Sequence, residues 1–360
     1  MSRRVVASAP GKLILMGEHA AVYGQPALVA AVDPRSWVEA NRAMDGLKVD
    51  LADLDQTIET SWQEAQRHAE LCREAWLLYA AEPSPERFAE VGTGSASDLA
   101  LVALGELAMR VGPEALRPLS IRIESGLPMG SGFGSSASIA VALVGSVLKV
   151  LLGEADPQDV DVLAFEVERR QHGLPSGVDH RTVLHGGVVV ARRQDNGSLR
   201  VEKLGTRSGA LHSLDVHQTG QPAETTGEVV AAVRRRHDRD PGAVGSLLER
   251  MGSAVLELRD QLVSPEGNRR KIVELFGSYE RYLEELGVVP MDVRLAIRQV
   301  EEGGGAAKIS GAGALTGAAA GCLLAYWPDD TPRERPVKLR TYPRQEVELG
   351  TEGLRIEECA

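Results

Sequence analysis

A glycine-rich stretch near the middle of the chain limits the folds that the chain can adopt. Three glycines, Gly130, Gly132 and Gly134, alternate with other residues between two segments of different periodicity. Before them, residues 119–123 alternate apolar and polar side chains, as a half-buried strand does. After them, residues 137–152 are almost wholly apolar and long enough for a buried helix. The sequence therefore predicts a strand, a glycine-rich turn and a helix.

This unit is typical of an anion site. Glycine reaches backbone conformations closed to other residues and lets the backbone approach a ligand closely. The N–H groups of the first helical turn have no partner within the helix, so they can bind phosphate. Ser135 and Ser136 add hydroxyls where a metal-bound phosphate would lie. A tight turn with a serine cap is the structural alternative.

The stretch fits neither of two common nucleotide-binding motifs. No lysine follows Gly134, where a Walker A sequence needs one. The acidic residues that follow about 20 residues later, Glu154 and Asp156, fall in a polar loop, which does not match a dinucleotide fingerprint. A phosphate cradle of another kind is the hypothesis that remains.

Composition limits the partners and the compartment. The 360 residues are 43% apolar and 25% charged, as in a globular protein of about two domains. A net charge of −11 argues against nucleic acid as a partner, because phosphate backbones call for a basic face. Three scattered cysteines without metal-ligand spacing are typical of reduced thiols. With no signal peptide and no run of 18 apolar residues, a cytoplasmic protein without a membrane anchor is expected.

Periodicity predicts further elements. Strands are expected at residues 5–7, 12–16, 27–32, 187–191 and 322–327, the first two separated by a break at Pro10-Gly11. Helices are expected at residues 61–81, 99–111 with Ser97 as N-cap, 157–171, 245–262, 269–286 and 291–302. Residues 194–199 are a candidate crossing into a second domain, and the tail from Val337 alternates as a strand does. Strands and helices interleave without the alternation of a parallel barrel, so the predicted class is α+β.

Asp179 is a candidate catalytic base. It lies in a predicted loop that contains Pro175 and Gly177. A rigidly held carboxylate suits a kinase that must accept or orient the proton of a hydroxyl. The alternative is a turn aspartate that bonds its own backbone.

Glu168 is a candidate metal ligand. It lies in the last turn of a predicted helix, where a carboxylate faces the negative end of the helix dipole. A bound Mg²⁺ would reverse that unfavourable interaction. An ion-pair cluster with Arg169 and Arg170 is the simpler explanation.

The segment around Lys12 offers further polar groups. Lys12 follows Pro10-Gly11 and precedes a buried-looking strand, so it could reach a transferring phosphate. Its alternative is a surface lysine at a strand edge. Glu18 and His19 follow that strand, and Thr225 forms a capping box with Glu228 ahead of an apolar-periodic segment.

Together these segments resemble the family of small-molecule kinases that groups galactokinase, homoserine kinase, mevalonate kinase and phosphomevalonate kinase. Three motifs appear in the family's order, at residues 10–19 (PGKLILMGEH), 127–137 (LPMGSGFGSSA) and 308–313 (KISGAG). The first motif with its continuation to Gly24, and residues 168–179, are most similar to those of the mevalonate kinases. Two features depart from that pattern. His180 follows Asp179 where Asn is common, and residues 314–321 are longer and bulkier than the usual glycine run.

The resemblance implies a fold and an activity. Residues 1–200 would form an ATP-binding domain resembling a small-subunit ribosomal protein, and residues 201–360 a ferredoxin-like domain, with the active site in the cleft between them. The implied reaction is ATP- and Mg²⁺-dependent phosphorylation of the 5-hydroxyl of (R)-mevalonate, a step of isoprenoid synthesis, by a homodimeric enzyme. A sugar kinase, another mevalonate-pathway kinase, and a non-catalytic regulator on the same fold are the alternatives.

The resemblance also implies roles for individual residues. Asp179 and Lys12 would be catalytic, and Ser136 and Glu168 would bind Mg²⁺. The phosphates of ATP would be held by Pro128, Gly130, Ser131, Gly132, Phe133, Gly134, Ser135 and Ser136. The mevalonate pocket would be formed by Glu18, His19, Ser176, Thr225, Gly311 and Ala312.

Overall fold

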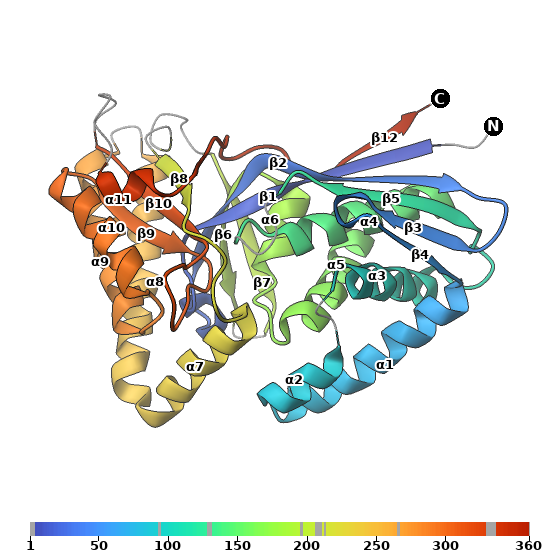
Figure 1. The fold of residues 1–360 in the computed structure, drawn as a ribbon, viewed down its shortest axis with the longest axis horizontal. Coiled ribbons are helices and arrows are strands. Elements are labelled where there is room, and N and C mark those ends of the chain that lie inside the picture. The colour runs from blue at the N-terminus through green and yellow to red at the C-terminus, as the bar shows by residue number, and fades with distance from the viewer. Residues whose placement is uncertain are drawn as a thin grey trace.

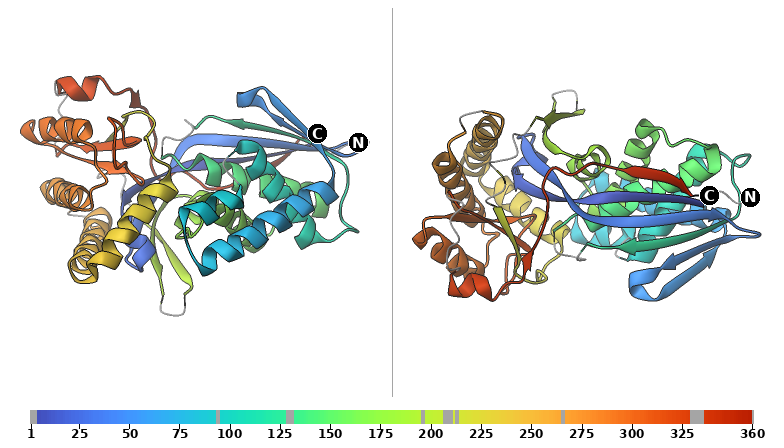
Figure 2. Two further views of the ribbon diagram at one scale, coloured as in Figure 1. Left: turned by 60° about the horizontal axis from the view of Figure 1, so that its bottom comes forward. Right: turned by 90° about the horizontal axis from the view of Figure 1, so that it is seen from above.

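The computed structural model describes residues 4–92, 95–127, 132–194, 197–205, 211, 214–264, 267–328 and 336–359. Within them, two sheets with their helices form two units that lie side by side (Figure 1). The predicted α+β class is confirmed. Both termini lie at the same end of the first unit (Figures 1 and 2).

The first unit is built on an eight-stranded sheet of order β12-β1-β2-β5-β3-β4, with β6 pairing to β2 and β7 to β6. Every neighbouring pair is antiparallel except β3 and β5. Its strands are β1 (Arg4–Met16), β2 (Ala27–Arg42), β3 (Leu47–Leu51), β4 (Gln56–Thr60), β5 (Leu119–Ser125), β6 (Val188–Arg193), β7 (Leu199–Leu204) and β12 (Arg355–Cys359). In β5 the predicted alternation is confirmed, with successive side chains buried and exposed in turn.

The second unit is built on the antiparallel sheet β11-β8-β10-β9. Its strands are β8 (Leu214–Gln218), β9 (Ala306–Ser310), β10 (Cys322–Tyr326) and β11 (Arg344–Gln345). Its helices are α7 (Thr226–Arg239), α8 (Pro241–Val263), α9 (Arg269–Glu285), α10 (Met291–Glu302) and α11 (Val337–Arg340). Four of these helices match segments predicted from apolar periodicity or, for α7, from the Thr225 capping box.

Helices of the first unit pack beneath its sheet (Figure 1). They are α1 (Trp62–Ala81), α2 (Pro85–Val91), α3 (Ala96–Val111), α4 (Ser135–Leu152), α5 (Pro157–His172) and α6 (Val178–His185), and two 3₁₀ turns lie at Ala20–Tyr23 and Ala52–Leu54. Among the described residues, only α4 is long and apolar enough to span a membrane, and 72% of it is buried inside the protein. It is the central core helix of this unit.

The long β1–β2 ribbon joins the two units. At one end of the ribbon, Val5, Ala7 and Ala9 belong to the core under the first sheet. At the other end, Leu13 and Leu15 belong to the core that includes α8 and α9. Lys12 therefore lies where one hydrophobic core ends and the next begins, which places it between the units.

The predicted break at Pro10-Gly11 is wrong, because β1 continues through it. The register with β2 shifts there instead: Pro10 pairs with Arg35 and Gly11 with Val32, so β2 takes up the irregularity as a bulge. Close packing requires a glycine at position 11. A Cβ at this position would lie 2.5 Å from Leu127 Cδ2 and 2.9 Å from Phe133 O.

Three other local predictions need correction. Ser95, rather than Ser97, caps α3 by accepting a hydrogen bond from Asp98 N. Asp179 lies in the first turn of α6 rather than in a loop. The tail from Val337 begins with a short helix, and its strand pairing comes later, in β11 and β12.

The predicted crossing at residues 194–199 is also wrong. Gln194 N donates to Ser198 O, and β7 returns to pair with β6 in the first sheet. A division at residue 200 would cut β7, and β12 pairs with β1 although it ends the chain. We therefore propose that the second unit begins after β7 and that the last strand belongs to the first unit.

Candidate active site

The three sequence motifs meet between the two units. Lys12 N donates to Phe133 O (2.8 Å), which ties the first motif to the second. Ser310 Oγ accepts from Ile14 N (3.1 Å) and donates to Ile14 O (3.0 Å), which ties the third motif to the first. A Cβ on Gly132 would lie 3.1 Å from Ser310 O, so the second and third motifs also touch.

Lys12 and Asp179 form the ion pair at this junction. Lys12 Nζ lies 3.0 Å from Asp179 Oδ2, and the lysine is only 5% exposed. The Asp179 side chain is 27% exposed, so the pair opens to solvent on the carboxylate side. The alternatives of a surface lysine and of an aspartate that bonds its own backbone do not describe this geometry.

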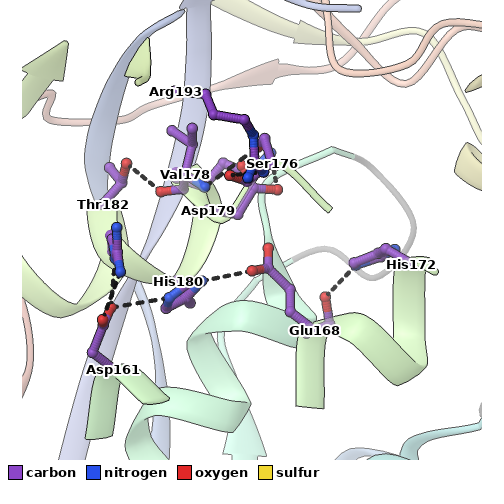
Figure 3. Close-up of polar contacts among 12 residues, drawn as sticks. Asp161, Glu168, His172, Ser176, Val178, Asp179, His180, Thr182 and Arg193 are labelled. Atoms are coloured by element: carbon purple, nitrogen blue, oxygen red, sulfur yellow. Dashed lines mark hydrogen bonds and ion pairs between the residues drawn. The ribbon is translucent and has the colours of Figure 1, made fainter. Parts of the chain in front are cut away.

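The turn before α6 positions Asp179. Gly177 has φ +79° and caps the helix, a left-handed conformation that glycine adopts without strain. Ser176 Oγ accepts a hydrogen bond from Val178 N (3.3 Å), and its carbonyl accepts one from Arg193 (Figure 3). Ser176 therefore holds the turn.

The start of α4 lies beside Lys12 and has no side-chain cap on its backbone N–H groups. The helix begins at Ser135, and its N-cap Gly134 brings no side chain to bond those groups. Gly134 has φ +72°, and a Cβ there would lie 2.7 Å from Lys12 Cγ. The Phe133 side chain is buried in the core, and its carbonyl accepts the hydrogen bond from Lys12 N. Pro128, Gly130 and Ser131 lie outside the described residues.

A small apolar hollow adjoins this loop. Ser125 links the two, because its N–H donates to Asp53 Oδ2 (2.6 Å) and its hydroxyl lies 3.4 Å from Ser135 Oγ. The hollow is lined by Leu51, Asp53, Leu54, Ala96, Leu99, Ile123, Ser125 and Ile139.

Glu168 is held by histidine rather than by arginine. Its Oε2 accepts a 2.6 Å hydrogen bond from His180 Nδ1, and His180 Nε2 donates to Asp161 Oδ1 (3.0 Å; Figure 3). Arg169 and Arg170 bind Glu166, and Arg170 also binds Glu106. The ion-pair cluster considered as the alternative therefore exists, but Glu168 is outside it.

The two carboxylates also fix the charge of His180. Burial opposes a charged ring, yet Glu168 and Asp161 outweigh it and raise the pKa of His180 to about 9. Burial likewise opposes the charge on Asp161, but hydrogen bonds from His180 and Arg181 hold its pKa below the ordinary value. His180 is therefore an imidazolium at neutral pH.

Ser136 and Glu168 suit a metal that arrives with its nucleotide. A hydroxyl and a carboxylate are hard oxygen donors, which Mg²⁺ prefers. Within the described residues no cluster of three or more His, Cys, Asp or Glu side chains is arranged to hold a metal ion. Mg²⁺ commonly needs only one or two protein carboxylates together with water and phosphate oxygens, so this pair of donors fits it. Ser136 Oγ also lies 3.2 Å from His172 Nε2.

A buried charge cluster underlies the loop that follows β1. Lys308 Nζ donates to Glu18 Oε1 (2.5 Å), and the Tyr279 hydroxyl accepts from Gly17 N (2.9 Å) and donates to Glu18 O (3.2 Å). Burial raises the pKa of Glu18, and Lys308 opposes that rise. Glu280 Oε2 accepts from Ile309 N (3.1 Å), and burial raises its pKa well above the ordinary value. The cluster ties the first and third motifs to α9.

His19 has a constrained backbone and a free ring nitrogen. Its φ of +60° is uncommon for a residue with a side chain and marks a position fixed by its surroundings. Its Nε2 donates to Ala312 O (2.9 Å), and burial lowers the pKa of the ring to about 4. The ring is therefore neutral at pH 7, and Nδ1 is an acceptor without a hydrogen-bond partner among the described residues.

Thr225 caps α7. Its hydroxyl accepts from Glu228 N (3.3 Å) and donates to Glu228 Oε2 (2.8 Å), as the capping box predicts. The neighbouring Glu224 accepts from Leu315 N (3.0 Å) and from Thr316 Oγ1 (2.6 Å). The bulky continuation of the third motif is thus fastened beside the start of α7, and Gly311 lies against Gly132.

Sequence reasoning assigned no role to four polar residues of this region, namely Asp161, His172, His180 and Lys308. One signal was available: Asp161 and Glu168 are two helical turns apart on α5 and share a face. His180 was noticed only as a departure from a family pattern. Its contacts depend on the packing of α6 on α5, which no local pattern encodes.

Comparison with known proteins identifies the family of this chain. The GHMP kinases N-terminal domain matches residues 92–187. The chain is 30% identical to the mevalonate kinase of Pyrococcus abyssi over 99% of both chains, and 30% identical to that of Pyrococcus horikoshii over the full length of both. The Methanococcus jannaschii mevalonate kinase structure shares the fold at a TM-score of 0.69 and 20% identity, covering 98% of this chain and 96% of that one. The chain therefore belongs to the mevalonate kinase family of the GHMP kinases.

Proposed function

We propose that this protein transfers the γ-phosphoryl group of ATP to the 5-hydroxyl of (R)-mevalonate. The observation that carries the proposal is the Lys12–Asp179 pair, 3.0 Å apart where the three motifs meet. Full-length similarity to mevalonate kinases supports the choice of acceptor. The expected products are 5-phosphomevalonate and ADP, an early stage of isoprenoid synthesis.

ATP would bind at the start of α4, with its phosphates on one side and its adenine ring on the other. Backbone N–H groups of residues 132–136 would bind the phosphates, because the start of α4 has no capping side chain. Pro128, Gly130 and Ser131 complete this set as predictions. The adenine ring would lie toward the hollow next to Ser125, since most of its lining is apolar and Ser125 contacts Ser135 at the start of α4.

Mg²⁺ would be held by Ser136 and Glu168. When bound, the ion neutralises charge on the phosphate oxygens. Glu168 suits this role because one carboxylate oxygen is fixed by His180, while the other has no hydrogen-bond partner among the described residues. Glu168 lies on α5 and Asp179 on α6, and these two helices pack against each other (Figure 3).

Asp179 and Lys12 would divide the chemistry between them. The hydroxyl oxygen of the acceptor forms a bond to the γ-phosphorus, and the Asp179 carboxylate accepts the hydroxyl proton. The bond between the γ-phosphorus and the bridging oxygen breaks, and that oxygen leaves with ADP. The Lys12 ammonium lies against the negative charge of the group in transfer. Phosphoryl transfer needs chiefly positioning and charge stabilisation from the protein, which one base and one lysine can supply.

The acceptor pocket would lie beside His19. Its unprotonated Nδ1 can accept a hydrogen bond from a substrate hydroxyl, and Ala312 fixes the ring. Ser176 lies on the turn that carries Asp179, and Gly311 lies against the phosphate loop. Direct substrate contacts by Glu18 and Thr225 stay predictions, because both side chains already have partners within the protein.

A substrate panel tests this proposal. Purified protein is mixed with ATP, Mg²⁺ and, in turn, (R)-mevalonate, phosphomevalonate, galactose and homoserine, and ADP release is followed. We expect rapid release with (R)-mevalonate alone. Turnover of a sugar without turnover of mevalonate would reject the proposed acceptor. The expected homodimer is tested on the same preparation by sedimentation, and cytoplasmic location stays a prediction.

A further inference from the structure

His180 bridges two carboxylates of one helix. Asp161 and Glu168 project from the same face of α5, two turns apart, and the imidazole ring lies between them at 3.0 and 2.6 Å (Figure 3). The ring is 1% exposed. It belongs to α6, where it directly follows Asp179 in the sequence. One side chain thus connects the helix of the proposed metal ligand to the helix of the proposed base.

The ring cannot easily turn away from this position. Phe165 stacks on it with ring centroids 5.2 Å apart. Arg181 binds both oxygens of Asp161, at 2.8 and 2.9 Å, so the anchoring carboxylate is itself fixed. A ring held on both edges and one face transmits a defined orientation to whatever it bonds.

Glu168 depends on this ring for its orientation. Within the described residues, His180 is the one hydrogen-bond partner of the Glu168 carboxylate, which is 4% exposed. The neighbouring arginines are engaged elsewhere. Without the ring, the carboxylate would be free to rotate in a nearly buried space.

We propose that His180 is a positioning residue that aims the Glu168 carboxylate at the metal–nucleotide complex. The inference rests on the proposed function, in which Glu168 binds Mg²⁺. An asparagine side chain is too short to bond carboxylates on two opposite sides. In this chain the orientation of the Glu168 carboxylate therefore depends on a bridge that asparagine cannot form.

Binding of Mn²⁺ together with ADP, measured by electron paramagnetic resonance on the full chain, tests the proposal. His180→Asn should weaken Mn²⁺ binding in the presence of ADP about tenfold, the lower end of the usual cost of losing a partner of a metal ligand. The matched control is His185→Asn, the same substitution at the exposed far end of α6, which should bind as the wild type does. Thermal unfolding is recorded for each variant.

The outcomes separate positioning from a merely structural role. A His180→Asn variant that unfolds at lower temperature but binds Mn²⁺ and ADP with wild-type affinity would overturn the proposal. If the His180→Asn variant does not fold, Asp161→Asn decides, because this substitution loosens the ring while leaving it in place. Asp161→Asn should weaken Mn²⁺ binding about threefold, less than loss of the ring itself. Wild-type binding by this second variant would also overturn the proposal. Because this assay contains no acceptor, it is independent of whether the wild type phosphorylates mevalonate.

Discussion

Strand β1 and the turn after it carry one member of each of two lysine–carboxylate pairs. Lys12 and Asp179 lie 3.0 Å apart with side chains 6% and 27% exposed, whereas Lys308 and Glu18 lie 2.5 Å apart at 0% and 1%. The buried pair lies beside Tyr279 and Glu280, and the other is open to solvent on the Asp179 side. We therefore propose that the same chemical pair serves stability where it is enclosed and catalysis where it is open to solvent.

The largest effect is expected at the open pair. Asp179→Asn should lower turnover by on the order of 10²–10⁴-fold, because the base that accepts the hydroxyl proton is lost. ATP binding, measured by calorimetry, should survive, since the phosphate loop is unchanged. Turnover like that of the wild type would remove Asp179 from the mechanism.

The enclosed pair should respond in stability instead. Lys308→Met leaves Glu18 buried without its cation, which costs about 3–5 kcal/mol of unfolding free energy. Urea denaturation followed by circular dichroism measures this loss. Equal stability of variant and wild type would show that burial does not separate the two pairs in the way we describe.

Thr225 sharpens the comparison, because it has both a structural and a proposed substrate role. Thr225→Ala should lower the unfolding free energy by about 1 kcal/mol through loss of the helix cap. Thr225→Ser keeps the hydroxyl and should restore it. If the KM for mevalonate rises in the alanine variant and not in the serine variant, the hydroxyl also serves the acceptor; an unchanged KM limits it to the cap.

The smallest effect is expected at a fully surface pair. Arg122 Nη1 lies 2.6 Å from Asp50, but its side chain is 54% exposed. Arg122→Ala should change the unfolding free energy by about 1 kcal/mol or less, since water and salt screen such pairs. A loss as large as that of Lys308→Met would mean that distance rather than burial governs these pairs.

Local patterns predicted most helices and the three motifs. Apolar periodicity located α1 and α10 to within about a residue, because it depends only on neighbours in sequence. A break was predicted at Pro10-Gly11 where β1 in fact continues, since only the partner strand reveals the bulge. The return of β12 to β1 is equally invisible, because pairing between chain ends leaves no local trace.

The candidate site divides in the same way. Lys12 and Asp179 could be named from motifs, and the structure brings them together. The partners that hold the site could not be named. Lys308 is enclosed by residues from three elements, and His180 acquires its role only when α6 packs on α5. Residue type suggested the chemistry, and tertiary packing selected the supporting residues.

Turnover of the Lys12→Met variant tests the central claim most directly. At saturating ATP and mevalonate, loss of the ammonium that faces the transferring group should lower turnover on the order of 10²–10³-fold, as loss of a transition-state donor does. Relative to the wild type, Lys12→Met should lose less unfolding free energy than Lys308→Met does. A Lys12→Met enzyme that turns over at the wild-type rate would contradict the assignment of this pair to catalysis.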